Sequence, residues 1–213
     1  KDINLKTNAL KIQNIHTKEL SEKAYDRILG TDGAFSAVRL RLMKTDRFNF
    51  SQNYLEHGYK ELHIPANADG THKLDKNSLH IWPRGQFMLI ALPNIDGSFT
   101  LTLFFPYDGE VSFTSLDTDE KVLAFFQKTF PDTLPLIPNL IKDYNENPTA
   151  DLVTMRCSPW HYQDKICLMG DASHAIVPFY GQGMNSGFED CRVLNELVTQ
   201  HKEDWPEILS QYQ

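Results

Sequence analysis

Cysteine, positive charge and long hydrophobic segments are all scarce in this chain. Three cysteines among 213 residues are too few for a disulfide-stabilised fold and indicate a reducing compartment. Lys and Arg number 21 against 28 Asp and Glu, a formal charge of −7, and this balance argues against binding to a nucleic-acid backbone. No apolar run approaches the ~20 residues that span a membrane.

The rest of the composition is that of a folded, globular protein. Hydrophobic residues make up 41% and charged residues 23% of the chain, which is typical of a sequence with a packed core. The length allows one large domain or two small ones. The chain begins at Lys1 without Met and ends at Gln213, just after the start of a predicted helix. We therefore expect it to be part of a longer protein.

The middle of the chain has the alternation of β-strands, followed by helical patterns. Residues 87–92 form a continuous apolar run, and residues 99–105 alternate after a loop that contains Asp96-Gly97. This pattern predicts an antiparallel hairpin with two rather apolar faces, one packed on a core and one lining something else. A capping-box pattern, Asp117 with Glu120, predicts a helix that ends before Pro131.

The segment that carries chemistry is a strand followed by an acid, a glycine-rich turn and a helix. A buried-strand pattern over residues 165–169 ends in Gly170-Asp171, and glycines follow at 181, 183 and 187. A helical pattern begins among these glycines, with apolar residues at spacings of three or four: Met184, Phe188, Cys191, Leu194 and Val198. The start of a helix offers unpaired N–H groups and partial positive charge. Glycines let a ligand approach the backbone closely. An Asp after a strand can accept hydrogen bonds from sugar hydroxyls. The segment predicts a site for a planar or anionic group.

Simpler interpretations exist for the same residues. The glycines alone are compatible with nothing more than a tight turn. A hydrolase triad is disfavoured because Asp171, Ser173 and His174 are too close in sequence to converge on one bond, and we expect His174 to make local contacts. A zinc site is disfavoured because its ligand spacing is not matched by Cys157, His161 and Cys167. We predict neither a catalytic side chain nor a metal ligand in this chain.

Two motifs, taken together, resemble a known enzyme family. Residues 170–185 resemble the second flavin motif of FAD-dependent aromatic hydroxylases. Residues 29–39 resemble the Asp-Gly motif of that family, G-x-D-G-x-x-S-x-V-R, and both motifs occur in the family's order. Residues 79–100 are similar to the substrate domain of the branch that acts on L-kynurenine. The resemblance covers roughly residues 26–198.

The resemblance implies a fold, a domain organisation and an activity. The expected fold is an α/β FAD-binding (Rossmann-like) part plus an α+β substrate domain on an antiparallel or mixed sheet. Residues 1–42 would belong to the FAD-binding domain and 43–152 to the substrate-binding domain. Residues 153–213 would return to the FAD-binding domain and begin the C-terminal helices. The implied activity is hydroxylation of L-kynurenine to 3-hydroxykynurenine, with tightly bound FAD, NADPH as reductant and O2 as co-substrate. Two alternatives stay open: a related flavin hydroxylase of another phenol or aniline, and a non-catalytic flavin-fold binding module.

The resemblance also implies roles for individual residues. Asp171 would bind the ribityl chain of FAD, the residues from Gly183 to Asn185 would meet the pyrimidine edge of the flavin, and Asp32 would support the pyrophosphate and nicotinamide side. The full implied cofactor set is Asp32, Gly170, Asp171, Pro178, Gly181, Gly183, Met184 and Asn185. The implied substrate set is Met88, Ile90, Leu92 and Phe104 from the sheet, with Pro178, Phe179 and Gln182 from the loop.

The chain departs from the family pattern in three respects. It lacks the opening G-x-G-x-x-G fingerprint, the Arg and Tyr expected to grip the substrate carboxylate, and the C-terminal helices. We therefore expect the isolated chain to bind FAD weakly or not at all, and tight binding in a flavin fluorescence titration would contradict this. The resemblance further implies attachment to the cytosolic face of the mitochondrial outer membrane through a C-terminal part absent here. The charge balance predicts no nucleic-acid partner.

Overall fold

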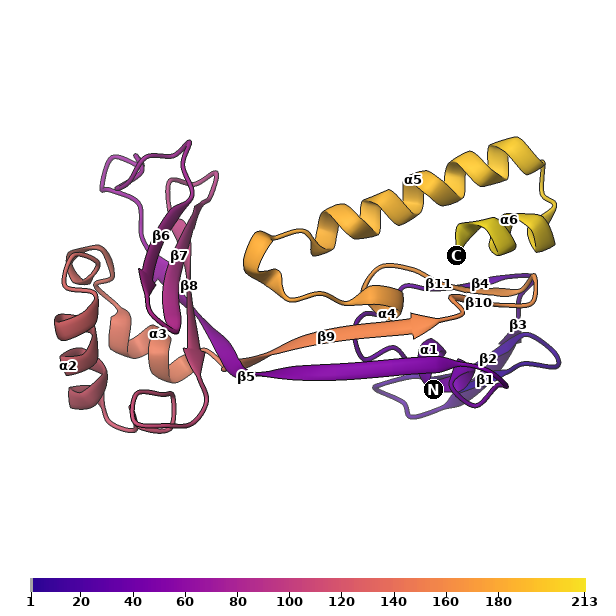
Figure 1. The fold of residues 1–213 in the computed structure, drawn as a ribbon, viewed down its shortest axis with the longest axis horizontal. Helices are drawn as coiled ribbons and strands as arrows, with labels where there is room; N and C mark the ends of the chain where they lie inside the picture. The colour runs from indigo at the N-terminus through magenta and orange to yellow at the C-terminus, as the bar shows by residue number, and fades with distance from the viewer. Residues whose placement is uncertain (1) are drawn as a thin grey trace. The chain divides into compact units, whose positions relative to one another are not determined.

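A computed structural model describes residues 2–213 and divides the chain into two compact units (Figure 1). The first unit combines the chain up to Asn53 with Val153–Gln213, and the second is Tyr54–Leu152. The chain passes from the first unit to the second within strand β5 (Asn49–Ile64) and returns within strand β9 (Ala150–Ser158).

The first unit contains two small sheets. Strands β1 (Asp2–Asn4), β2 (Ala9–Gln13) and β3 (Leu20–Ala24) form an antiparallel meander. Strands β10 (His161–Tyr162), β11 (Ile166–Leu168) and β4 (Ile28–Gly30) form the second sheet in that order. Strands β11 and β4 are parallel, with Leu168 opposite Gly30. Because parallel strands end at the same edge, the segments that follow Gly30 and Leu168 start side by side.

Helices cover both faces of the β10-β11-β4 sheet. They are α1 (Ala37–Leu42), α4 (Asp171–His174), α5 (Gly183–His201) and α6 (Trp205–Tyr212), with a 3-10 turn η2 (Pro178–Tyr180). Ile166 and Leu168 pack with α1, whereas Cys167 between them packs with α5 and α6. Strand side chains alternate between faces, so a strand buried on both faces reads as a continuous apolar run. Figure 1 shows α5 and α6 side by side on one face of this sheet.

The second unit is a sheet with helices on one face. Its strand order is β6-β7-β8-β5-β9, with β6 (His80–Arg84), β7 (Phe87–Pro93) and β8 (Phe99–Pro106) antiparallel. Helices α2 (Asp119–Thr129) and α3 (Leu140–Glu146), with the 3-10 turn η1 (Leu134–Leu136), pack on that face (Figure 1). The core there is made by alternate residues of β7 and β8, including Leu89, Ala91, Leu101, Leu103 and Phe105.

Several local expectations differ from the structure. The meander β1–β3 is not expected from the sequence, since every residue of β3 is exposed and its pattern carries no alternation. The cap of α2 is Thr118, whose side chain accepts a hydrogen bond from the Lys121 amide, and Asp117 instead accepts one from Lys121 Nζ at 2.6 Å. Among residues 2–213, no helix is both long and apolar enough to cross a bilayer.

Candidate functional site

The segment after β4 is organised by a carboxylate. Asp32 Oδ1 accepts a hydrogen bond from Ser36 Oγ at 2.5 Å, and Oδ2 accepts from the backbone N of Ala37 at 2.7 Å and of Val38 at 3.2 Å. Ser36 in turn accepts from the Arg39 amide at 2.9 Å and is the N-cap of α1. We call residues 31–36 the Asp-Gly loop. Both oxygens of Asp32 are thus engaged by its own chain, which favours a role in shaping the loop over direct contact with a ligand.

A buried arginine links the Asp-Gly loop to the segment after β11. Arg39 is 4% exposed; its Nη1 donates to Ala172 O at 2.7 Å, and its Nη2 donates to Ala34 O and contacts Met155 Sδ. The guanidinium lies 4.8 Å from the Phe50 ring centroid. Burial lowers the pKa of Arg39, and Cys157 and Asp32 oppose that effect. The Asp-Gly motif includes this arginine, but nothing in the sequence indicates that it is buried or which carbonyls it binds.

The segment after β11 is a tight turn, residues 170–174, which we call the Gly-Asp turn. Gly170 has φ 57° and ψ −143°, a backbone conformation that glycine adopts without strain. Its carbonyl accepts from the Ser173 and His174 amides at 2.9 and 3.0 Å. Asp171 is exposed at the first position of α4. A Cβ added to Gly183 would lie 3.9 Å from Asp171 Oδ1, so the structure brings these two predicted residues together.

Helix α5 begins without a side-chain cap. Within the described chain its N-cap residue, Gln182, makes no capping hydrogen bond, and the first turn has no acidic residue. The Gln182 side chain instead donates to Tyr180 O at 3.1 Å and accepts from Asn185 Nδ2 at 2.9 Å. Gly181 before it has φ 61°, in the left-handed region. The first amides of α5 therefore keep their hydrogen-bonding capacity and partial positive charge for another acceptor.

The inward face of α5 is the predicted one only in the second half of the helix, where Leu194 and Val198 pack with α6. The sequence predicts an apolar face that starts at Met184 and Phe188, yet these side chains are 70% and 65% exposed. The face turned toward the Gly-Asp turn carries Gly183, Gly187 and Asp190, at spacings of four and three. A Cβ added to Gly187 would lie 3.9 Å from Gly170 Cα. Glycine lets two backbones come this close. This close packing decides which face of α5 lies against the Gly-Asp turn, although that face has low hydrophobicity.

The predicted substrate residues lie in both units. Met88, Ile90 and Leu92 alternate along β7 on the face opposite the helices, and Phe104 of β8 is paired with Met88. Ile90 and Phe104 are buried, whereas Leu92 is 52% exposed. Pro178 and Phe179 form η2 in the first unit, and Gln182 precedes α5. The remaining predicted cofactor residues all belong to the first unit.

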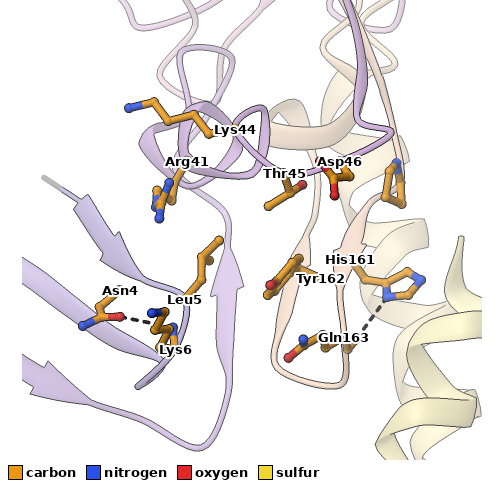
Figure 2. A pocket seen from close by; sticks show the side chains of 11 residues that line it. Asn4, Leu5, Lys6, Arg41, Lys44, Thr45, Asp46, His161, Tyr162 and Gln163 are labelled. Carbon is orange, nitrogen blue, oxygen red and sulfur yellow. Dashed lines mark hydrogen bonds between the residues drawn. The ribbon is translucent and has the colours of Figure 1, made fainter.

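Several hollows open on the surface of the first unit. One has a volume of about 680 Å³, and Figure 2 shows the side chains around it, among them Lys6, Arg41 and Lys44. No predicted site residue lines this hollow. Another has a volume of about 520 Å³ and is lined by His174, Asn185, Ser186, Glu189 and Asp190. The start of α5 is therefore accessible at a surface hollow.

The described residues contain no group of three or more side chains suited to hold a metal ion. Burial raises the pKa of Cys157 to about 11 and that of Cys167 to about 12. Both side chains are thus neutral thiols near neutral pH, and thiols bind metals weakly compared with thiolates. The chemistry available at the site is hydrogen bonding: amide donors at the start of α5 and an exposed carboxylate acceptor at Asp171.

Comparisons with known proteins identify relatives of this chain. A kynurenine 3-monooxygenase of Flavobacterium johnsoniae is 58% identical to this chain over 212 residues, which are 100% of this chain and 48% of that protein. A kynurenine 3-monooxygenase of Dictyostelium discoideum is 66% identical over 163 residues, 76% of this chain and 35% of that protein. The chain thus spans about half the length, or less, of these curated relatives.

The fold also has relatives among solved structures. A structure of 2-methyl-3-hydroxypyridine-5-carboxylic acid oxygenase matches 97% of this chain and 52% of its own chain, with a TM-score of 0.73 and 20% sequence identity. Residues 26–213 match the family described as FAD binding domain. That match includes both motif loops and the whole β6-β7-β8-β5-β9 sheet between them. This chain belongs to the FAD binding domain family.

Proposed function

We propose that this chain is part of an FAD-dependent monooxygenase that hydroxylates L-kynurenine to 3-hydroxykynurenine, with NADPH as reductant and O2 as co-substrate. The observation that carries the proposal is the uncapped start of α5 beside the Asp171 carboxylate, within a chain 58% identical to a kynurenine 3-monooxygenase. FAD, when bound, supplies the electron transfer and oxygen activation that protein side chains do not. The protein binds the cofactor, orients it and excludes water.

The residues present fit FAD in two respects. The exposed carboxylate of Asp171 can accept hydrogen bonds from the hydroxyls of a ribityl chain, and it lies beside Gly183. The first amides of α5 can donate to the carbonyls at the pyrimidine edge of a flavin, because no side chain of the described residues caps them. The helix dipole would stabilise negative charge at that edge by up to ~2 kcal/mol in a partly buried site. The side chain of Asn185 would also donate to the flavin if its hydrogen bond to Gln182 were replaced by one to the cofactor.

The choice of L-kynurenine among aromatic substrates is supported by the second unit. Residues 79–100, which carry β6, β7 and the start of β8, are where the sequence resembles the kynurenine branch. The β7 face with Met88 and Ile90 is apolar and lies opposite the helix-covered core. Such a face can pack against an aromatic ring and exclude water from the reacting centre. The assignment of the individual substrate residues stays a prediction.

The proposal is tested with the full-length protein. We expect it to bind FAD, and L-kynurenine to stimulate its oxidation of NADPH and yield 3-hydroxykynurenine, identified by mass spectrometry. A panel of phenols and anilines is the control for specificity. Stimulation and product with another compound but not with L-kynurenine would indicate a different flavin hydroxylase. Failure to bind FAD, or binding without oxidation of NADPH under any substrate, would indicate a non-catalytic module.

Replacing Phe179 by alanine is expected to uncouple NADPH oxidation from hydroxylation in the full-length protein. The large apolar ring would exclude water near the reacting carbon, and its removal leaves space for solvent. We expect NADPH oxidation to continue while hydroxylated product per NADPH falls several-fold. Product and NADPH are measured in the same assay, together with released peroxide. Ile95→Ala, at a fully exposed loop position, is the control. Unchanged coupling in Phe179→Ala would remove Phe179 from the substrate site.

The cellular location also stays a prediction. The resemblance implies attachment of the whole protein to the cytosolic face of the mitochondrial outer membrane. Fractionation of cells that express the full-length protein tests this directly, since recovery outside the mitochondrial membrane fraction would contradict it.

A further inference from the structure

A buried carboxylate on α5 holds the Gly-Asp turn. Asp190 is 8% exposed, and its Oδ2 accepts hydrogen bonds from the Gly170 amide at 2.6 Å and from His174 Nε2 at 2.7 Å. Burying a carboxylate is costly unless hydrogen bonds compensate it. A single oxygen here binds both ends of the turn, residues 170 and 174. The carboxylate therefore restrains the whole turn from one point.

The restrained turn is the one that carries Asp171. The Gly170 carbonyl already accepts from the Ser173 and His174 amides, which closes the turn from within. Asp190 adds the link from the turn to α5, so that Asp171 and the start of α5 keep one relative position. Gly187 and Gly183 on the same helix face allow the approach that makes this link short. The spacing of Gly183, Gly187 and Asp190 places all three on one side of α5.

His174 is held on its other side by an aromatic ring. The Trp160 ring lies 5.1 Å from the His174 ring, and Trp160 Nε1 donates to Cys157 O at 2.8 Å. The imidazole is therefore fixed both by packing and by its bond to Asp190. Neither His174 nor Asp190 belongs to the predicted cofactor set. Because the imidazole is fixed, the position of α5 also fixes the position of residue 174 at the end of the Gly-Asp turn.

We infer that Asp190, with His174 as its partner, is a positioning residue that sets Asp171 and the first amides of α5 in the geometry that binds FAD. The inference rests on the proposed function, because it needs FAD at this site. It assigns Asp190 no contact with the cofactor. Its effect passes through the Gly170 amide and the His174 ring. Loss of the carboxylate charge should therefore loosen the site and change the surroundings of the bound flavin.

The test uses the full-length protein with Asp190→Asn. We expect the dissociation constant for FAD to rise about ten-fold, equivalent to ~1.4 kcal/mol, because an amide replaces a charge-assisted acceptor of two hydrogen bonds. The visible absorption bands of the bound flavin should shift, and the rise in unfolding temperature on saturation with FAD should shrink. Glu196→Gln removes the same charge from an exposed position of α5 and should leave all three readouts unchanged.

A second pair of variants separates positioning from folding. His174→Ala should weaken FAD several-fold, and His174→Gln, which restores a side-chain donor, should recover most of the affinity. If Asp190→Asn does not fold, the two His174 variants test whether this pair positions the FAD site. Lower stability of the apoprotein with unchanged FAD affinity and spectrum would overturn the inference and leave Asp190 a structural residue. A wild-type protein that does not bind FAD would instead overturn the proposed function.

Discussion

Replacing Asp171 by alanine is expected to abolish stable FAD binding by the full-length protein. The exposed carboxylate stands at the start of α4 and beside Gly183, where a ribityl chain can donate hydroxyl hydrogen bonds to it. Hydrogen bonds to a charged acceptor contribute ~1.5–3 kcal/mol each. Losing two of them weakens binding by at least ~3 kcal/mol, or more than 100-fold. The fold should be little affected, because substitutions of exposed side chains usually change stability by less than ~0.5 kcal/mol.

The measurement is a flavin fluorescence titration of the refolded or flavin-depleted full-length protein. Asp171→Asn keeps the shape and one acceptor oxygen, so we expect an intermediate loss. Asp26→Ala, which removes an exposed carboxylate elsewhere in the same unit, serves as the matched control. A wild-type dissociation constant in Asp171→Ala would mean that this carboxylate does not bind the cofactor, and the site assignment would be wrong.

Replacing Arg39 by methionine is expected to be the most destabilising of these substitutions. The guanidinium satisfies the carbonyls of Ala172 and Ala34, and methionine leaves the buried Ala172 acceptor and the partly buried Ala34 acceptor without it. Each unsatisfied buried group costs ~1–3 kcal/mol, and the contact with the Phe50 ring is lost as well. We expect a loss of at least ~3 kcal/mol. FAD binding should fail too, since Arg39 joins the Asp-Gly loop to the Gly-Asp turn.

Thermal unfolding of the full-length protein measures this effect, with an expected fall in midpoint of at least ~5 °C. Arg39→Lys keeps the charge but not the planar fork of donors, so it should recover only part of the stability. Arg192→Met is the matched control, because Arg192 is exposed and its ion pairs lie on the surface of α5; exposed pairs of this kind contribute ~0–1 kcal/mol. An unfolding midpoint for Arg39→Met equal to that of Arg192→Met would contradict the structural role.

Local patterns in the sequence predict much of the fold. The apolar run at 87–92 and the alternation at 99–105 form β7 and β8, paired in register from Met88–Phe104 to Pro93–Phe99. The expected class, an α/β flavin-binding part with an antiparallel or mixed sheet, is confirmed by the family match and by the fold of solved relatives. The meander β1–β3 escapes prediction because a strand exposed on both faces leaves no hydrophobic period to detect.

The candidate site, like the fold, could be predicted from the sequence only in part. Periodicity marks α5 as a helix, and Leu194 and Val198 of the predicted apolar face pack inward. In the first half of α5, however, Met184 and Phe188 are exposed and the inward face carries Gly183, Gly187 and Asp190. Hydrophobic periodicity identifies a stripe of apolar residues on a helix. Close packing between backbones instead requires small residues such as glycine, which a hydrophobicity pattern does not detect. The roles of the individual cofactor and substrate residues stay predictions that the proposed substitutions test.

The two motif loops, the hairpin of the second unit and the family can all be identified from the amino-acid sequence. These features depend on residues near one another in the chain, so local spacing is enough to identify them. The tertiary structure decided that Arg39 binds the carbonyl of Ala172 and that Asp190 binds the amide of Gly170. These partners are 133 and 20 residues apart. The bond of Arg39 forms only after parallel strands β4 and β11 bring their loops to one edge. The bond of Asp190 forms only after α5 packs against the Gly-Asp turn, and no local pattern contains either relation.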